Sequence, residues 1–149
     1  MNNGELIAQT ALTWIGTPYA NNAMAKGQGV DCAMLVIGVL EECGLLQPNQ
    51  IKVEHYSNEW HLHRNEEKFI KHLELFAYEV DADDIQVGDF VLYQYGRCIS
   101  HGSIYVGNNM VAHAYVDMGV ILSRIDDTLF YDSKGKHRMR KVYRYKEIA

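Results

Sequence analysis

An apolar segment with a clear start and a clear stop constrains the fold of this chain most. Residues 33–40 are almost wholly apolar, Asp31 and Cys32 come directly before them, and Gly44 follows. Aspartate is a good helix N-cap and glycine commonly ends a helix, so the pattern predicts a buried helix that begins at Cys32. Unpaired backbone N–H groups and the helix dipole favour a thiolate in the first turn, and the thiolate is the nucleophilic form of cysteine.

Length, charge and hydropathy exclude several classes of protein. The chain has 149 residues, enough for one domain with a real core, and we expect a single domain over residues 1–149. Its formal net charge of -5 argues against nucleic acid as a partner, because phosphate binding needs a basic surface. No apolar stretch reaches the roughly 18 residues of a membrane span. The start, Met1 to Glu5, lacks the features of a signal peptide, so action outside a cytoplasm would need another route of delivery.

The order of the predicted elements indicates an α+β fold. Apolar periodicity predicts helices over residues 5–15 and 66–76, in addition to the helix after Asp31. The second half is strand-like, and the predicted strands cover residues 90–93, 101–107, 110–116, 120–122 and 142–145. Helices followed by strands are typical of N-terminal helices packed on a central antiparallel β-sheet.

The cysteine and histidine spacings give no sign of a metal site. The three cysteines have no CxxC spacing, which predicts neither a disulfide framework nor a zinc site. We expect Cys43 to be a small buried apolar residue and Cys98 to be structural. His61 and His63 are two residues apart, but nothing near them supplies the further ligands that zinc needs. The sequence therefore predicts no metal and no cofactor.

Cys32 and His101 form the candidate catalytic pair. A cysteine at a helix N-terminus that faces a histidine on a sheet is the papain-like arrangement, and His101 is predicted to open a strand after a polar loop. His113 lies on the next predicted strand, where it could fix the tautomer of the His101 ring. Each also has a plainer interpretation, with Cys32 as an apolar core residue and His113 as a hydrogen-bonded core histidine.

The predicted hairpin between the two histidines raises a geometric problem. A two-residue turn at Asn108 and Asn109 would place His113 opposite Ile104, on the face of the sheet away from His101. The triad therefore requires a bulge or a longer loop, which a left-handed asparagine could supply. Even then the two histidines would meet diagonally across the strands.

Several short motifs occur in the order in which one known family has them. They are Trp14-Ile15-Gly16-Thr17-Pro18-Tyr19, Gly29-Val30-Asp31-Cys32 with Leu35-Val36, Val87-Gly88-Asp89-Phe90-Val91, Ser100-His101 running into Ile104-Tyr105-Val106-Gly107-Asn108, and Val111-Ala112-His113-Ala114. Together they span most of residues 5–125 and resemble the NlpC/P60 family of cysteine peptidases. An extra segment with Tyr56, Ser57 and Trp60 resembles the phage-encoded branch of that family.

The resemblance implies a papain-like fold and cleavage of amide bonds in the stem peptides of bacterial peptidoglycan. The usual bond lies between γ-D-glutamyl and a diamino acid. Carried over residue by residue, Cys32 is the nucleophile, His101 the base and His113 the orienting residue. Tyr19 matches a tyrosine beside the nucleophile, and its hydroxyl is expected to help bind the oxyanion.

Residues next to the catalytic pair complete the expected site. Asp31 and Ser100, directly before Cys32 and His101, are expected at the oxyanion or substrate site. The chain also departs from the family pattern: Ala33-Met34 stands where Ser-Gly is frequent, Asn21-Asn22 replaces a glycine pair, and Gly102 replaces an aliphatic residue. None of these changes removes a catalytic group, but they leave the substrate pocket undefined.

Two other functions stay open at the level of sequence. An amidase or acyltransferase could use the same cysteine and histidine, and its products would differ. A phage tail or assembly component could only bind the peptide, with phage tail proteins as partners. The basic segment from Lys134 to Arg144 is expected to be a solvated surface or a strand edge, which could touch acidic cell-wall polymers. The expected place of action is the bacterial cell wall, reached from a virion, at lysis or from a prophage.

Overall fold

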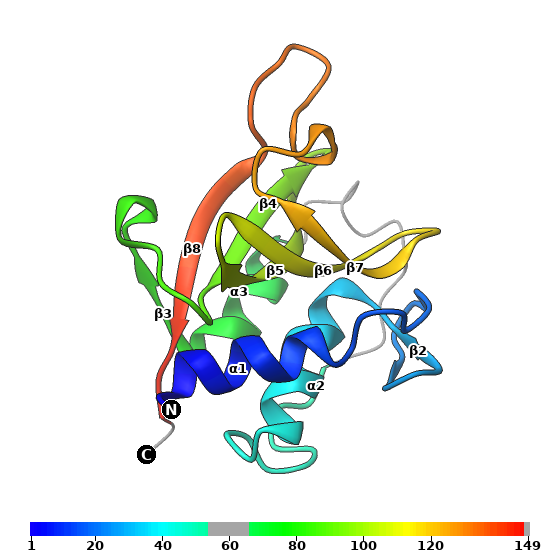
Figure 1. The fold of residues 1–149 in the computed structure, drawn as a ribbon, viewed down its shortest axis with the longest axis vertical. Coiled ribbons are helices and arrows are strands. Elements are labelled where there is room, and N and C mark those ends of the chain that lie inside the picture. The colour runs from blue at the N-terminus through cyan, green and yellow to red at the C-terminus, as the bar shows by residue number, and fades with distance from the viewer. Residues whose placement is uncertain (54–65, 148–149) are drawn as a thin grey trace.

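The computed structural model describes residues 1–53 and 66–147, in which helices pack against a six-stranded sheet (Figure 1). Helices α1 (Asn3–Leu12), α2 (Cys32–Glu42) and α3 (Glu66–Glu74) all precede this sheet in the sequence. The antiparallel sheet has the order β3-β8-β4-β5-β6-β7, built from β3 (Ala77–Val80), β4 (Phe90–Tyr95), β5 (Cys98–Gly107), β6 (Met110–Tyr115), β7 (Gly119–Arg124) and β8 (Met139–Tyr145). The predicted α+β architecture is confirmed.

Besides β3, four short elements were not predicted. A two-stranded ribbon of β1 (Met24–Ala25) and β2 (Gly29–Val30) lies between α1 and α2. Two 3-10 turns, η2 (Ala82–Asp84) and η3 (Thr128–Phe130), connect strands. Each 3-10 turn begins after an aspartate whose side chain accepts a backbone N–H two residues later, which is a local signal for a turn.

Helix α1 is shorter than the predicted 5–15. The side chain of Asn2 caps it by accepting the Glu5 N–H at 2.8 Å, and Ile7 and Ala11 are among its buried residues. The helix ends at Leu12 because the chain then turns toward the sheet, where the Gly16 N–H donates to the Val120 carbonyl at 3.0 Å. This connection attaches the end of α1 to β7.

Helix α2 begins and ends close to where its sequence signals place it. The Asp31 carboxylate accepts the Met34 N–H at 2.9 Å, and the chain leaves the helix through Gly44 at φ 77°. The residues between are almost all buried, and α2 packs against α1 and β5. A helix that is apolar on nearly every face is stable only in such a covered position.

Strand β5 starts earlier than predicted, so His101 does not open it. The strand begins at Cys98, and the expected polar loop is reduced to a turn at Gly96 and Arg97. Cys98 is 0% exposed and Ile99 is 4% exposed. Pairing with β4 buries these residues despite their polar neighbours, and His101 therefore lies within the strand, opposite Tyr93.

The hairpin between β5 and β6 contains the bulge that the two histidines require. Asn108 and Asn109 both have positive φ, 54° and 61°, as a two-residue hairpin turn demands. The register shifts beyond the turn, so Ile104 pairs with Ala112 instead of with His113. Because side chains alternate between faces, this shift puts His113 on the same face as His101, and the prediction of a bulge is confirmed.

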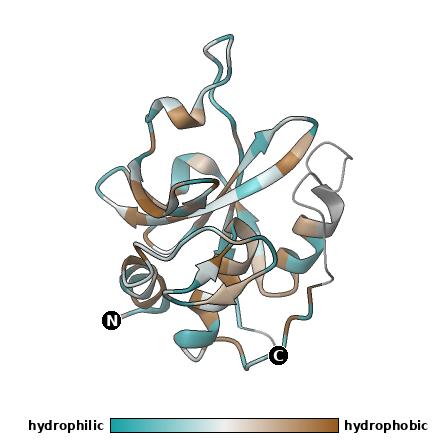
Figure 2. Ribbon diagram, turned by 90° about the vertical axis from the view of Figure 1, so that its right-hand side faces the viewer, coloured by the Kyte–Doolittle hydropathy of each residue, from teal (hydrophilic) through white to brown (hydrophobic). Residues whose placement is uncertain are grey.

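The basic segment from Lys134 to Arg144 divides into a loop and an internal strand. The connection from β7 to β8 projects beyond the sheet (Figure 1) and is largely hydrophilic (Figure 2). Residues 133–136 are exposed, in agreement with a solvated surface. The end of the segment is internal to the sheet, because Val142 and Tyr143 pair with both β3 and β4.

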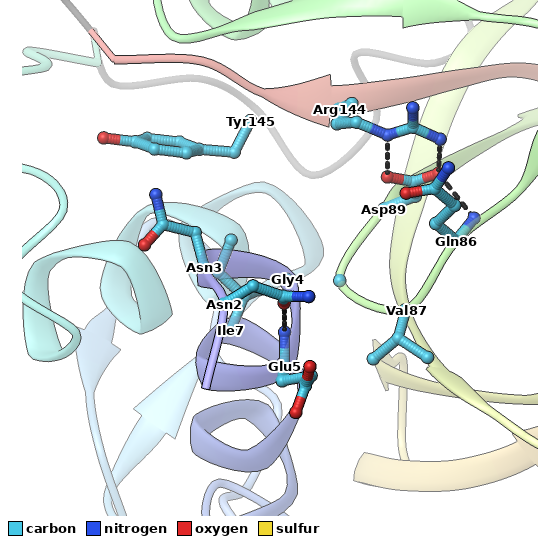
Figure 3. Close-up of a pocket in the computed structure, with 11 residues that line it drawn as sticks. Asn2, Asn3, Gly4, Glu5, Ile7, Gln86, Val87, Asp89, Arg144 and Tyr145 are labelled. Carbon is cyan, nitrogen blue, oxygen red and sulfur yellow. Dashed lines mark hydrogen bonds and ion pairs between the residues drawn. The ribbon is translucent and has the colours of Figure 1, made fainter.

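A buried ion pair ties β8 to the turn before β4. The Arg144 guanidinium donates to both oxygens of the Asp89 carboxylate, each at 2.9 Å, and the Asp89 side chain is only 2% exposed (Figure 3). The pair lines a pocket of about 450 Å³ beside the N-terminus of α1. None of the predicted site residues lines this pocket, so it is separate from the candidate active site.

Replacing Arg144 with alanine would leave the Asp89 carboxylate buried without its cation. We expect the free energy of unfolding to fall by about 3 kcal/mol, measured by urea denaturation. The matched control is Arg124→Ala, which removes an ion pair to Asp126 whose side chains are 62% and 58% exposed. This control is expected to cost less than about 1 kcal/mol, and equal losses from both variants would contradict a special role for the buried pair.

Candidate active site

Cys32 is the first residue of α2, and its thiol lies against β5. The Sγ–H donates to the Ser100 carbonyl oxygen at 3.5 Å, and the backbone N–H of Gly102 also acts on the sulfur. Cys32 is 6% exposed and His101 is 7% exposed. The fold thus brings the sulfur against the backbone on both sides of His101.

Two histidines and a serine form a hydrogen-bonded chain across three neighbouring strands. His101 Nε2 lies 2.9 Å from His113 Nδ1, and His113 Nε2 lies 2.9 Å from Ser123 Oγ. His113 is fully buried and Ser123 is 5% exposed. The two histidines meet diagonally between β5 and β6, as the sequence predicts once the hairpin carries a bulge.

Aromatic rings enclose this chain. The His101 ring lies 5.6 Å from the rings of Tyr93 and Tyr95 and 5.7 Å from that of Tyr115, between centroids. The His113 ring lies 5.0 Å from Phe130. These contacts limit rotation of both imidazoles and keep bulk water from their hydrogen bond, which strengthens it.

Asp31 directly precedes Cys32, and Tyr19 forms a β-bridge with Val30, just before Asp31. Asp31 is 1% exposed, and its carboxylate accepts the N–H groups of Met34 at 2.9 Å and of Asn22 at 2.6 Å. Burial raises the pKa of the Tyr19 hydroxyl, and electrostatic interaction with Cys32 and Asp31 raises it further, so this hydroxyl stays protonated. The structure places Asp31 as the residue that fixes the loop carrying Tyr19 to the start of α2.

Ser100 contacts the Cys32 thiol through its backbone carbonyl, while its side chain bonds elsewhere. Its carbonyl accepts the thiol, while its hydroxyl donates to the Tyr95 carbonyl at 3.1 Å. Ser100 is 8% exposed. The hydroxyl therefore stabilises the turn between β4 and β5 and aligns the strand that carries His101.

Burial sets the resting protonation of the pair. It raises the pKa of the Cys32 thiol to about 12, to which the charge of Asp31 adds, while N–H groups at the start of α2 and at Gly102 lower it by less. Burial also lowers the pKa of His101 well below 6.5, and His113 lowers it further. The resting groups are a thiol and a neutral imidazole. The N–H groups at the helix N-terminus favour the thiolate, as the sequence indicates, but desolvation outweighs them.

This protonation state predicts slow alkylation of Cys32 at neutral pH. Only the thiolate reacts, and for a pKa of about 12 its fraction rises about tenfold per pH unit between pH 7 and 10. The half-buried Cys43 is expected to react first with iodoacetamide. Peptide mass spectrometry after timed alkylation at several pH values gives both rates. Fast labelling of Cys32 that levels off near pH 6 would instead indicate a thiolate–imidazolium pair.

Some of the site gave little signal in the sequence. Ser123 follows Ile121 and Leu122 in a strand, and one serine among apolar residues does not reveal a buried partner for a histidine. The resemblance to the phage-encoded branch rests on Tyr56, Ser57 and Trp60, which lie outside the described residues, as do His61 and His63. Within residues 1–53 and 66–147, no group of three or more histidine, cysteine or acidic residues is placed to hold a metal ion. No helix in that part of the chain has the length and apolar character needed to cross a membrane.

Solved structures show the class to which this fold belongs. The chain is similar to the NlpC/p60 domain of the peptidoglycan hydrolase SagA, with a TM-score of 0.65, 16% identity and coverage of 96% of this chain and 99% of that one. It is also similar to NlpC2 from Trichomonas vaginalis, with a TM-score of 0.65, 19% identity and coverage of 97% and 46%. The architecture is therefore that of an NlpC/P60 domain.

The sequence leads to the same family. The profile of the NlpC/P60 family matches residues 16–139, and the chain belongs to this family. It is 31% identical over 108 residues to a probable endopeptidase of Mycobacterium tuberculosis, which covers 72% of this chain and 22% of that protein. It is 35% identical over 63 residues to murein DD-endopeptidase MepS/murein LD-carboxypeptidase of Escherichia coli K12, covering 42% and 32%. These matches span no more than about a third of either relative.

Proposed function

We propose that this chain is a cysteine endopeptidase that hydrolyses peptidoglycan stem peptides, with Cys32 as nucleophile, His101 as base and His113 as orienting residue. The observation that carries the proposal is the contact of the Cys32 thiol with the β5 backbone around His101, whose ring is hydrogen-bonded to His113. The names of its relatives, an endopeptidase and peptidoglycan hydrolases, support the substrate class. The bond proposed is that between γ-D-glutamyl and a diamino acid, which the family resemblance implies.

The first half of the reaction forms a tetrahedral intermediate on the sulfur. His101 Nε2 is engaged by His113, so Nδ1 is the nitrogen that takes the thiol proton. The sulfur attacks the peptide carbonyl carbon, and the oxygen becomes an oxyanion. The backbone N–H of Cys32 and the protonated Tyr19 hydroxyl are the proposed donors to it, a contribution of about 100- to 1000-fold in rate per donor in comparable sites.

The second half returns the enzyme to its resting state. The His101 imidazolium gives its proton to the leaving amine as the C–N bond breaks, which leaves the acyl group on sulfur. Water then attacks the thioester carbonyl while His101 accepts its proton. The C–S bond breaks, the sulfur regains a proton, and the carboxylic acid product leaves.

Mass spectrometry of purified muropeptides incubated with the protein tests the proposal. Hydrolysis of the proposed bond gives two fragments whose masses sum to the substrate plus one water, with the diamino acid at the new N-terminus. A cut between sugar and peptide would favour an amidase, and an acylated product that lacks the added water would favour a transferase. Bound but uncleaved muropeptide would favour a binding component and contradict the endopeptidase.

A further inference from the structure

Ser123 lies at the far end of the hydrogen-bonded chain that starts at His101. It is on β7, its Oγ lies 2.9 Å from His113 Nε2, and it is 5% exposed. No catalytic step described above uses it. A buried hydroxyl costs free energy unless it is hydrogen-bonded, so its partner defines its role.

A neutral imidazole carries one N–H, and this limits the chain to two patterns. In the first, His101 holds its proton on Nε2 and donates to His113 Nδ1, and His113 then holds its proton on Nε2 and donates to Ser123 Oγ. In the second, every proton is on the opposite nitrogen, and Ser123 is the donor. Only the first pattern leaves His101 Nδ1 free to accept the thiol proton.

We propose that Ser123 is a positioning residue whose oxygen accepts the His113 Nε2–H and thereby permits the tautomer in which His101 can act as a base. This inference rests on the proposed function, because it explains how His113, the proposed third residue of the triad, is oriented. It differs from a role for His113 alone: in the first pattern the His113 Nε2–H is buried, and without the Ser123 oxygen it would lose its acceptor. His101, Tyr115 and the charge of Asp127 are the other groups that act on the His113 ring.

The surroundings of Ser123 make the chain rigid enough for this selection. Both hydrogen bonds measure 2.9 Å, and the His113 ring is fixed between the rings of Tyr115 and Phe130, with centroids 5.7 Å and 5.0 Å away. His113 stays neutral near pH 7, because burial lowers its pKa to about 4. For a neutral ring held in one orientation, the tautomer is the one property that still varies.

The test is a Ser123→Ala variant, read by activity and by spectroscopy. We expect kcat on the muropeptide to fall about 10- to 100-fold with KM unchanged, the size seen when an outer hydrogen-bond partner is lost. Histidine ¹⁵N chemical shifts, measured without substrate, are expected to show His113 and His101 protonated on Nε2 in the wild type and a mixture of tautomers in the variant. Ser123→Thr, which keeps the hydroxyl, should restore both kcat and the wild-type ¹⁵N chemical shifts.

Ser103→Ala is the matched control. Ser103 is 0% exposed in the same sheet, and its hydroxyl is 2.8 Å from the Tyr93 hydroxyl, so its loss removes a buried serine hydroxyl but leaves the Ser123–His113 hydrogen bond in place. It should leave the histidine tautomers unchanged. Unaltered tautomers in Ser123→Ala would overturn the inference. Because the ¹⁵N measurement needs no catalysis, it separates failure of this inference from failure of the endopeptidase proposal.

Discussion

A Cys32→Ala protein is expected to bind muropeptides but to lose at least about 10⁴-fold in hydrolysis, because a methyl group cannot attack a carbonyl and removal of the nucleophile eliminates the covalent route. The fold should persist, since only one buried sulfur atom is removed. Initial rates from mass spectrometry of the two product fragments give the loss, and circular dichroism checks the fold.

Cys43→Ala is the matched control for that loss. Cys43 caps the opposite end of the same helix, and its thiol lies 3.8 Å from the Leu6 carbonyl in α1. Removing it takes away a sulfur at the other end of the helix, and activity should stay close to that of the wild type. A Cys32→Ala protein that still cleaves muropeptides, or a Cys43→Ala protein that is equally inactive, would end the assignment of the nucleophile.

A His101→Ala protein is expected to lose about 10⁴-fold in kcat at pH 7, because nothing else then takes the thiol proton. The residual activity should have a characteristic pH dependence. With a thiol pKa near 12, the thiolate must form by reaction with hydroxide, so the residual rate should rise about tenfold per pH unit above pH 7. The measurement is the pH dependence of initial hydrolysis rates for the variant and the wild type.

His72→Ala provides the control for His101. His72 is in the last turn of α3, and it is half-buried. Its loss should change neither the rate at pH 7 nor the pH profile. A His101→Ala rate that does not depend on pH would show that another group activates the sulfur, and His101 would then be a structural residue.

The site depends on strand register as much as on residue type. Without the bulge near the Asn108–Asn109 turn, His113 would lie on the opposite face from His101, and Ser123 would have no ring to bind. The three members of the hydrogen-bonded chain come from three successive strands of the sheet. Antiparallel pairing therefore builds the chain from side chains that are local neighbours in space but 10 and 12 residues apart in sequence.

The sequence determined those features that local chemistry controls. Asp31 and Gly44 bound the helix of the apolar segment because capping acts within one turn. Two asparagines that tolerate positive φ marked the hairpin, and the alternation of side chains required a bulge if the histidines were to meet. These inferences need no knowledge of distant residues, and they identified the strands and the helix on which the site stands.

Only the tertiary structure decided the features that burial and pairing control. The segment Gly96 to Ser100 has a polar sequence, yet pairing with β4 makes most of it strand, and β3 exists because β8 is there to pair with it. Ser123 became part of the site through a partner on another strand. The protonation of Cys32 was decided in the same way: the helix N-terminus is visible in the sequence, but the desolvation that outweighs it comes from atoms packed around the sulfur, and a linear pattern does not contain them.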